Sequence, residues 1–445
     1  MSNGKFENSV RLDRDACKGC TNCIKRCPTG AIRVRDGKAV ITKEYCIDCG
    51  QCIRVCPHHA KIATYDPVEH MKNYEYTVAL PAPSLYGQFN NLDDTNIVLT
   101  ALRKMGFDAV HEVGAAAEII SHISRDYVDA HPEQWPLIST ACPSVVKLIR
   151  VRFPNLIPQL LPLEAPVELA ATMARRKAME DTGLPSEKIG IFFISPCPAK
   201  VSSCKYPLTV DHCDVDEILA MKDVYPLLLP YMPESAEQPE ELAEAGRIGI
   251  GWGNSGGEAG GLLTDDYLAA DGIENVIKVL EDLEDQKFTN LKFIELNACM
   301  GGCVGGVLAV ENPYVARVKL KRLNKYLPVA KNHEVPEDLG FWNRKVEYEP
   351  VFKLGSTLKE SIAMMRKVDE LTERFPGMDC GSCGAPSCRA LAEDIVRGIA
   401  KESDCIYILK EYIQHISDEM SFLDVRKNRK ENKNDDQGTG GQGDL

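Results

Sequence analysis

The 445-residue sequence contains no apolar run of about 18 residues, the length that a membrane-spanning helix needs. Its first residues, Met1 to Arg14, are polar and lack the apolar core of a secretory signal. Basic residues do not predominate either, since 52 Lys and Arg stand against 65 Asp and Glu, a formal charge of −13. This balance argues against a nucleic-acid partner, which requires a cationic face. We therefore expect a cytoplasmic protein that binds no nucleic acid and does not insert into a membrane.

Cysteine, in contrast, is abundant, with 18 residues in the chain. A reducing cytoplasm disfavours disulfides, so we expect these thiols to bind metals or clusters. The length indicates roughly two to four domains. Apolar residues make up 44% of the chain, which is enough for packed cores.

Residues 15–57 contain an internal repeat in which four cysteines are followed by a proline. The two copies are Cys17-x2-Cys20-x2-Cys23-x3-Cys27-Pro28 and Cys46-x2-Cys49-x2-Cys52-x3-Cys56-Pro57. This is the spacing of bacterial two-cluster ferredoxins, in which the fourth cysteine of each run ligates the other cluster. The predicted ligands are Cys17, Cys20, Cys23 and Cys56 for one 4Fe-4S cluster, and Cys46, Cys49, Cys52 and Cys27 for its pair. Zinc is the alternative, and two complete copies with both prolines disfavour it.

The predicted two-cluster ferredoxin domain, residues 1–72, is of the α+β type and is locally basic. Between Met1 and Lys61 there are twelve Lys or Arg and six Asp or Glu, a net charge of +6. Anionic clusters would offset part of this charge. The remaining positive charge could attract an acidic redox partner. The alternative interpretation is that these residues are ordinary solvated surface charges.

From Tyr74 onward, apolar runs alternate with helical patterns. The predicted strands are residues 76–80, 109–113, 136–139, 189–194, 248–252 and 291–296. The predicted helices include residues 94–105, closed by Gly106, and residues 164–180. This alternation predicts an α/β domain over residues 73–345, with two parallel-sheet lobes and a site in the crevice between them.

Four more cysteines lie just beyond predicted strands, where ligands bind in open α/β sheets. They are Cys142, Cys197, Cys299 and Cys303. Four glycines at positions 301, 302, 305 and 306 allow the backbone around the last pair to wrap closely around a bulky group. We expect the four thiols to meet at one crevice and hold an inorganic cluster.

A last set of cysteines follows a predicted helix at residues 356–374. The spacing C-x2-C-x4-C-x16-C of Cys380, Cys383, Cys388 and Cys405 predicts one further 4Fe-4S cluster, with zinc as a competitor. It resembles the small 4Fe-4S module of corrinoid iron-sulfur proteins and electron-transport complexes. The predicted helical iron-sulfur domain spans residues 346–424. The polar residues 425–445 are predicted to be a disordered tail.

Three crevice motifs together resemble the signature motifs of FeFe-hydrogenases, the iron-only hydrogenases. They are Ala141-Cys142-Pro143, Pro196-Cys197-Pro198-Ala199-Lys200 and the stretch from Glu295 to Cys303. The resemblance implies an H-cluster, in which Cys142, Cys197, Cys299 and Cys303 hold a 4Fe-4S cube. By the same resemblance, Cys303 also bridges to a diiron subsite with CO, CN and azadithiolate ligands, and Lys200 pairs with a cyanide. The implied reaction is the reversible conversion of H2 into two protons and two electrons.

The sequence departs from the rapid enzymes of that family at several positions. Those enzymes have two adjacent cysteines in the first motif, and the first one passes protons to the bridgehead amine. Here that position is Ala141, whose methyl group neither donates nor accepts a proton. Ser195 and Asn297 each stand where those enzymes have methionine. This pattern resembles the sensory subgroup with an extra C-terminal 4Fe-4S unit, and implies slow turnover and a role as an H2 sensor for a redox or signalling partner.

If H2 reacts here, protons need a substitute path. Glu258, in a glycine-rich loop expected after a strand, and Glu295, at the end of a buried strand, are the candidate relay groups, with Cys204 as a possible third member. The alternative is that Glu295 is a structural hydrogen-bond acceptor, that Glu258 solvates a loop, and that Cys204 and Cys213 are small buried residues.

Two other functions compete with an H2 sensor. One is an electron-bifurcating or ferredoxin-linked hydrogenase, which the absence of a flavin or nicotinamide motif and the interrupted relay weaken. The other is a non-catalytic iron-sulfur electron-transfer or scaffold protein without the diiron subsite. Lys200 and the complete set of crevice cysteines argue against this second alternative.

Overall fold

The structure is a computed structural model that describes residues 8–331, 333–336, 338–351 and 353–435. The chain divides into two compact units. One comprises Met1–Ala31 and Val40–Val351, and the other comprises Ile32–Ala39 and Phe352–Leu445. The first unit thus contains both the ferredoxin-like cysteine repeat and the α/β region. Our finer boundaries at residues 72, 345 and 424 stay predictions.

Two parallel sheets form the framework of the first unit. The four-stranded sheet has the order β6 (Ala109–Val110), β5 (Tyr76–Pro81), β8 (Ile189–Ser195) and β9 (Glu217–Ala220). The three-stranded sheet has the order β10 (Tyr267–Asp271), β11 (Phe293–Asn297) and β7 (Leu137–Ile138). All of their strand pairs are parallel. The predicted α/β class of this region is therefore confirmed, while its division into two lobes stays a prediction.

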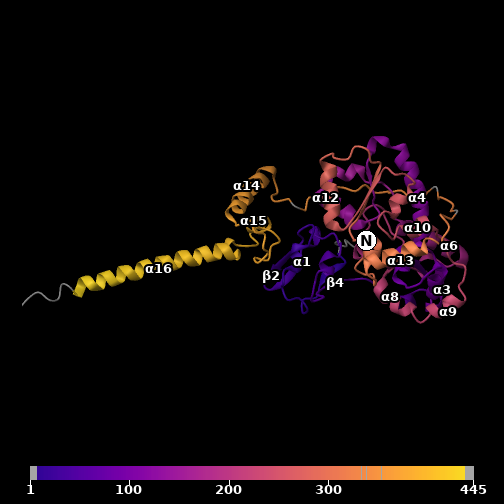
Figure 1. Ribbon diagram of the computed structural model, residues 1–445, viewed down its shortest axis with the longest axis horizontal. Coiled ribbons are helices and arrows are strands. Elements are labelled where there is room, and N and C mark those ends of the chain that lie inside the picture. Colours follow the sequence, from indigo (N-terminus) through magenta and orange to yellow (C-terminus); the bar gives the residue numbers. More distant parts are fainter. Residues whose placement is uncertain (1–7, 332, 337, 352, 436–445) are drawn as a thin grey trace, which may run out of the picture. The chain divides into compact units, whose positions relative to one another are not determined.

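Helices connect and cover these strands. They are α3 (Thr95–Met105), α4 (Val113–Ala130), α5 (Pro143–Arg152), α6 (Pro166–Thr182), α7 (Pro198–Lys205), α8 (Met221–Leu228), α9 (Met232–Glu237), α10 (Arg247–Gly251), α11 (Gly257–Gly261), α12 (Ile273–Glu284) and α13 (Pro313–Leu323). Figure 1 shows α3, α8 and α9 grouped on one side of the unit. Strand β8 is buried along its whole length, because helices cover both faces of a parallel sheet.

Two hydrophobic clusters pack against the sheets of the first unit. The larger cluster includes Leu80 and Phe192 of the four-stranded sheet. The smaller one includes Ile138 and Ile294 of the three-stranded sheet. It also contains Ile47 from the ferredoxin-like repeat, and it packs against both Cys49 and Cys142. One apolar core is therefore shared by the repeat and the crevice.

The ferredoxin-like segment is built from short elements. Strand β1 (Val10–Leu12) pairs antiparallel with β4 (Lys61–Ala63), and helices α1 (Asn22–Lys25) and α2 (Gln51–Arg54) contact each other. Strands β2 (Ile32–Arg35) and β3 (Lys38–Ile41) form a second pair.

The second unit contains α14 (Leu358–Arg374), α15 (Cys388–Val396) and α16 (Ile406–Asp435). Its small core includes Val368, Leu391 and Ile408. Asp394 is 5% exposed and accepts hydrogen bonds from Arg33 and Arg35 at 2.7 and 2.6 Å, so a pair of guanidinium groups compensates its buried charge.

Two sequence predictions differ from the structure. Residues 248–252 were expected to be a strand but lie mainly in α10, because Glu118 of α4 accepts hydrogen bonds from the Gly246 and Gly249 N–H groups at 2.9 and 3.2 Å. A Cβ atom on Gly249 would lie 2.0 Å from the Gly114 carbonyl oxygen, so the close packing of α10 on α4 requires glycine.

The expected disordered tail also differs over its first part. Residues 425–435 continue α16, where Lys, Arg and Glu are good helix formers. Residues 436–445 of that predicted tail lie outside the described residues. Within the described part of the chain, no helix has the length and hydropathy that a membrane crossing requires.

Candidate iron-sulfur and hydrogen site

The four crevice cysteines line a single cavity of about 90 Å³ between the ends of the two sheets. Cys142 caps the start of α5, and Cys197, just after β8, caps the start of α7. Cys299 and Cys303 lie in the loop that follows β11. The other predicted site residues in the cavity wall are Ala141, Lys200, Glu258 and Glu295. Residues from distant parts of the sequence thus meet at the carboxyl ends of parallel strands, where ligands bind in this fold class.

The thiols of this cavity are close enough to influence one another. Burial raises the pKa of Cys197 to about 11, and the neighbouring Cys142 adds to this effect. Burial raises the pKa of Cys303 to about 12, with further contributions from Cys142 and Cys197. The pKa of Cys299 is raised well above its usual value for the same reasons. Several thiolates at this place therefore require a strong positive partner.

Glycines let the loop of the third motif pass close to other segments. Gly302 has φ of +88°, and a Cβ atom there would lie 2.4 Å from the Ser255 nitrogen. A Cβ atom on Gly306 would lie 2.2 Å from the Pro196 oxygen of the second motif. Both positions therefore require glycine, and their contacts hold the Cys299/Cys303 loop against two other walls of the cavity.

Lys200 provides positive charge beside the thiols. Its side chain is half-buried and lines the cavity. Its ammonium group acts to lower the pKa values of Cys197, Cys303 and Glu258. This position favours anionic groups in the cavity.

Glu258 lies in the short helix α11, not in a loop after a strand as we had expected. It is 6% exposed, and the Ser139 hydroxyl donates a 2.6 Å hydrogen bond to its Oε2. Burial, together with the charge of Glu295, raises the pKa of Glu258 to about 8. This side chain can therefore take up or release a proton near neutral pH.

Glu295 is in β11 and is 2% exposed. Its two oxygens accept hydrogen bonds from the Gly256 N–H at 2.9 Å, the Ala259 N–H at 2.9 Å and the Asn297 amide at 2.7 Å. These contacts fit the role of a structural acceptor that positions α11, which was our alternative for Glu295. Asn297, which stands where the resemblance places methionine, is part of this arrangement.

Cys204 lies in the larger hydrophobic cluster and is not among the residues of the cavity wall. Its side chain forms a hydrogen bond with Cys213. Ser139 was missed by the sequence interpretation, because it is 119 positions from its partner Glu258 and no local pattern marks it.

In the ferredoxin-like repeat, the fourth cysteine of each run lies near cysteines of the other run. Cys27 lies near Cys46, Cys49 and Cys52, since each of these thiols experiences its charge. Cys23 likewise experiences the charges of Cys56 and Cys17. The exchange of cysteines between runs is the arrangement that the spacing predicts, while ligation itself stays a prediction.

The repeat packs directly beside the crevice. Gly50 has φ of +74°, and a Cβ atom there would lie 2.7 Å from a Val307 methyl group. Arg54 of α2 donates a 2.5 Å hydrogen bond to the Gly305 carbonyl oxygen, and its charge acts to lower the pKa of Cys299. These contacts place the two cysteine-rich regions of the first unit next to each other.

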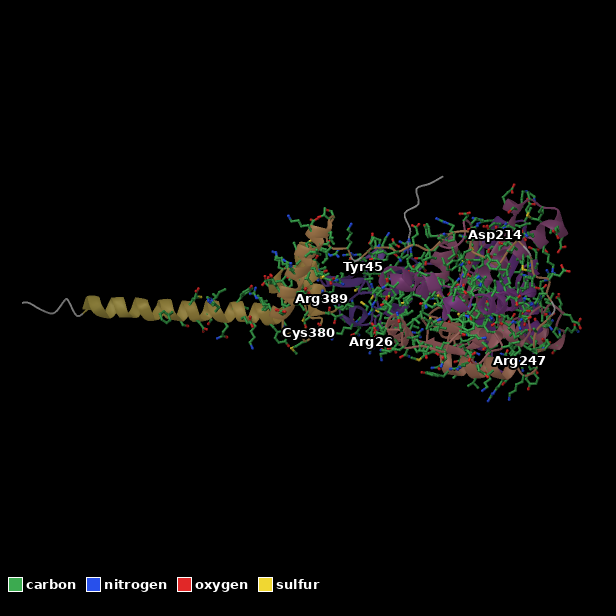
Figure 2. The ribbon with its side chains drawn as sticks, turned by 90° about the horizontal axis from the view of Figure 1, so that it is seen from above. Arg26, Tyr45, Asp214, Arg247, Cys380 and Arg389 are labelled. Carbon is green, nitrogen blue, oxygen red and sulfur yellow. The ribbon has the colours of Figure 1, made fainter. Side chains whose placement is uncertain are left out.

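The last four cysteines lie in the second unit. Cys383 experiences the charges of Cys380 and Cys405, and Cys388 begins α15. Figure 2 labels Cys380 and also Arg389 of α15, both in this unit. A loop with left-handed residues at Asp379, Gly381 and Gly384 carries the first two of these cysteines.

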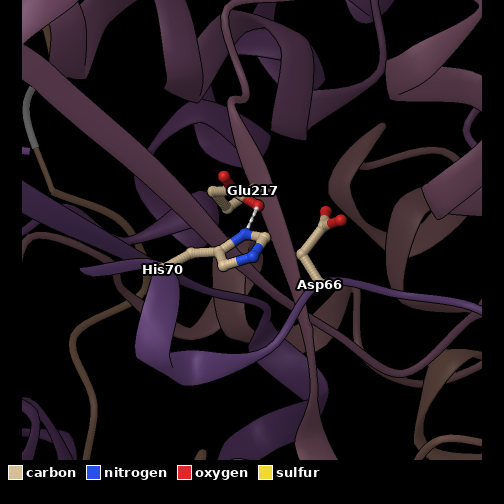
Figure 3. A group of neighbouring side chains, drawn as sticks. All are labelled: Asp66, His70 and Glu217. Atoms are coloured by element: carbon tan, nitrogen blue, oxygen red, sulfur yellow. Dashed lines mark hydrogen bonds and ion pairs between the residues drawn. The ribbon is translucent and has the colours of Figure 1, made fainter. Parts of the chain in front are cut away.

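A separate group of possible metal ligands is formed by Asp66, His70 and Glu217, whose ligand atoms lie within 4.8 Å of one another (Figure 3). His70 Nδ1 is 2.8 Å from a Glu217 oxygen. The Asp66 oxygens accept hydrogen bonds from Lys205 at 2.6 Å and from the Ile218 N–H at 2.9 Å. Since these carboxylates already have donors, the group connects Asp66 and His70 to strand β9 without requiring a cation.

Comparison with known families identifies the α/β region. A family model described as the iron only hydrogenase large subunit, C-terminal domain, matches residues 75–266 and 262–307, more than half of the chain. The chain belongs to the FeFe-hydrogenase family. A 4Fe-4S dicluster domain model matches residues 9–57 of this chain, and an Fe-S cluster model matches residues 375–407.

Two curated relatives have similar sequences. The NADP-reducing hydrogenase subunit HndD of Solidesulfovibrio fructosivorans is 24% identical over 348 residues, which cover 67% of this chain and 56% of HndD. Iron hydrogenase 1 of Clostridium pasteurianum is 23% identical over 406 residues, which cover 73% of this chain and 71% of the relative. This chain therefore spans little more than half the length of HndD.

Solved structures of FeFe-hydrogenases also match. A structure of HydA(deltaEFG), described for stepwise H-cluster assembly, is 16% identical, with a TM-score of 0.40 over 66% of this chain and 92% of that one. A variant of HydA1 from Chlamydomonas reinhardtii is 17% identical, with a TM-score of 0.39 over 64% of this chain and 90% of that one. At the family level, the family matches identify an iron-sulfur oxidoreductase of FeFe-hydrogenase type.

The raised pKa of Glu258 predicts a pH-dependent stability. Between its ordinary pKa of 4.5 and about 8, the folded protein retains a proton that the unfolded chain has lost. The free energy of unfolding should therefore fall as the pH rises through this range, by about 1.4 kcal/mol for each pKa unit. Glu258→Gln should remove this contribution and raise the thermal midpoint relative to the wild type at about pH 9 but not at about pH 5.

The matched control is Glu180→Gln, which changes an exposed glutamate of α6. Its thermal midpoint should follow that of the wild type at both pH values. Parallel curves for Glu258→Gln and the wild type would contradict the prediction.

Proposed function

We propose that the crevice of this FeFe-hydrogenase binds an H-cluster and that the protein reacts reversibly with H2. The observation that carries this proposal is the convergence of four thiols from segments beside both sheets on one cavity that Lys200 also lines. Cys142, Cys197, Cys299 and Cys303 would hold the 4Fe-4S cube, and Cys303 would also bridge to the diiron subsite.

The residues present suit such a group. Buried thiols bind iron as thiolates, and the positive charge of the iron would offset the burial and the mutual repulsion that raise the pKa values of these thiols. Lys200 offers an ammonium group to anionic ligands. The backbone around Gly302 and Gly306 approaches the site closely, as a bulky cluster requires.

When bound, the diiron subsite supplies the heterolytic cleavage of H2 and accepts its electrons. The reaction releases two protons, and the chain must remove each proton in turn from the cavity. Glu258 is suited to accept it, since its pKa is close to neutrality and its carboxyl group reaches both the cavity and Ser139. Glu295 would hold α11 in place and keep the pKa of Glu258 high through its negative charge. We leave Cys204 out of this relay because its partner is Cys213.

Electrons would leave through the iron-sulfur clusters. The ferredoxin-like repeat would hold two 4Fe-4S clusters, and the contacts of Gly50 and Arg54 support a short path to it from the crevice. The cysteines of the second unit would hold a third 4Fe-4S cluster. A redox or signalling protein would receive the output.

Ala141 supports slow turnover and a sensory role. Its methyl group lines the cavity at the position where the resemblance places a proton-passing cysteine. General acid-base groups contribute typically about 10²- to 10⁴-fold to rates, so their absence limits the reaction. A sensor requires H2 binding and a readout more than fast turnover. This site would retain the binding and the readout.

The first prediction concerns the diiron subsite. After reconstitution of the clusters and installation of the diiron group, the protein should show infrared bands of carbonyl and cyanide ligands. Cys303→Ser should lose these bands because the bridging thiolate is absent, while the ferredoxin-type electron paramagnetic resonance (EPR) signals remain. Cys213→Ser, outside the cavity wall, is the control and should retain both. A wild-type protein with a loaded cube but no such bands would be an iron-sulfur scaffold.

The second prediction concerns Ala141. Ala141→Cys should raise the H2 oxidation rate at least about tenfold, because a thiol restores a proton donor and acceptor at that place. Ala141→Ser is the size-matched comparison, and its weaker acid should yield a smaller gain. Equal rates for the wild type and the cysteine variant, both with full iron content, would remove the argument for slow turnover from this residue.

The third prediction separates the two glutamates. Glu258→Gln should lower H2 oxidation at least about tenfold and remove the pH dependence near about pH 8, because an amide cannot carry the proton. Glu295→Gln retains hydrogen-bond acceptor capacity at one oxygen, so it should lower the thermal midpoint but leave a measurable rate. Unchanged H2 oxidation in Glu258→Gln would exclude this relay, whatever the rate of Glu295→Gln.

A further inference from the structure

Lys147 is a buried lysine of α5 that the proposed reaction does not use. The residue is 6% exposed. Its ammonium group donates a 2.8 Å hydrogen bond to Ser202 Oγ and lies 3.4 Å from Asp48 Oδ2. A buried ammonium is costly unless it serves nearby negative groups, so its surroundings indicate its purpose.

Each of the three segments that meet at Lys147 also carries predicted cluster ligands. Lys147 lies on α5, and Cys142 is the residue that immediately precedes this helix. Ser202 lies on α7, which is capped by Cys197. Asp48 lies between Cys46 and Cys49 of the ferredoxin-like repeat. One ammonium group thus connects both cysteine-rich regions of the first unit.

The charge of Lys147 acts on a thiol of the ferredoxin-like repeat and on a thiol of the crevice. Burial lowers the pKa of Lys147, while the charges of Asp48, Cys46 and Cys197 act to raise it, so the ammonium group interacts with a thiol of each site. Asp48 is held beside Lys147 by two further hydrogen bonds, which its oxygens accept from the Val10 N–H at 3.0 Å and the Asn8 amide at 3.2 Å.

The surroundings of Lys147 screen the electric field of its ammonium group only weakly. The hydrophobic cluster that contains Val145, Val146 and Ile47 packs against Cys49 and Cys142. Apolar packing keeps the local dielectric low, so salt and water screen a charge less than at the surface.

We propose that Lys147 is a shared counter-charge for two iron-sulfur sites, the ferredoxin-type cluster of Cys27, Cys46, Cys49 and Cys52 and the crevice cube. This inference rests on the cluster ligation of the proposed function. A fixed positive charge stabilises the more negative, reduced form of each cluster, and so raises both reduction potentials in the same direction. The reduction potentials of the two clusters therefore stay close to each other, and an electron can pass between them without a large change in free energy. Lys147 is a positioning residue and does not contact a substrate.

The test is a redox titration of the full chain with reconstituted 4Fe-4S clusters, followed by EPR. In Lys147→Met, which removes the charge and keeps the length, both the ferredoxin-type signal and the crevice-cube signal should shift to lower potential. The expected shift is at least a tenfold change in the ratio of reduced to oxidised cluster, about 59 mV for one electron. Lys205→Met is the matched control, since Lys205 is a half-exposed lysine of α7 paired with Asp66, and both potentials should stay unchanged.

A shift of one signal alone, or of neither, would overturn the proposal. If Lys147→Met fails to load iron, Lys147→Gln is titrated instead, because its amide retains a hydrogen-bond donor for Ser202. The expected shift of both reduction potentials is the same. Failure of both variants to load iron would make Lys147 a folding residue and would also overturn the proposal. A wild-type chain that shows no crevice-cube signal would overturn the proposed function itself, whereas normal wild-type signals with unshifted variants overturn this inference alone.

Discussion

The burial of four thiols at one point is the constraint on which the rest of the first unit depends. Cys142, Cys197, Cys299 and Cys303 share a cavity in which each thiolate is disfavoured by burial and by its neighbours. The thiols stay protonated there unless a strongly positive group binds, and in the proposed function iron is that group. The parallel sheets serve this purpose, since their carboxyl ends direct the cysteine-bearing loops to a common edge.

The glycine-rich segments follow from the same constraint. The third motif passes so close to Ser255 and Pro196 that Gly302 and Gly306 have no room for a side chain. Helix α10 packs on α4 through Gly249 and Gly114, and α11 follows it with Glu258 in the cavity wall. Close backbone packing therefore brings the Glu258 carboxyl group to the cavity wall, which Glu295 also lines.

Around the thiols, positive charge is supplied from three directions. Lys200 lines the cavity, Arg54 reaches the Cys299 loop from the ferredoxin-like repeat, and Lys147 lies between Cys46 and Cys197. Two of these cations also contact cysteine-bearing segments: Arg54 donates to the Gly305 carbonyl oxygen, and Lys147 lies beside Ser202 and Asp48. In this arrangement, electrostatic stabilisation of the site and the docking of the repeat depend on the same side chains.

The sequence by itself determined what depends on local spacing. The cysteine runs predicted which thiols would lie together, the alternation of apolar and helical patterns predicted parallel sheets, and the three crevice motifs pointed to the family. Each of these features is encoded within a few residues, because ligand geometry and secondary-structure period act over short distances.

Only the tertiary structure decided which distant side chains meet. Ser139 and Glu258 are 119 positions apart, and Lys147 is 99 positions from Asp48. The interpretation of residues 248–252 as a strand was wrong for the same reason, since the partner of α10 is Glu118 on a distant helix. Glu295 and Glu258 look alike in the sequence. In the structure, the Glu295 carboxylate accepts hydrogen bonds from three groups, whereas the Glu258 carboxylate accepts one from the Ser139 hydroxyl. Such differences arise from packing between elements, which sequence spacing does not encode.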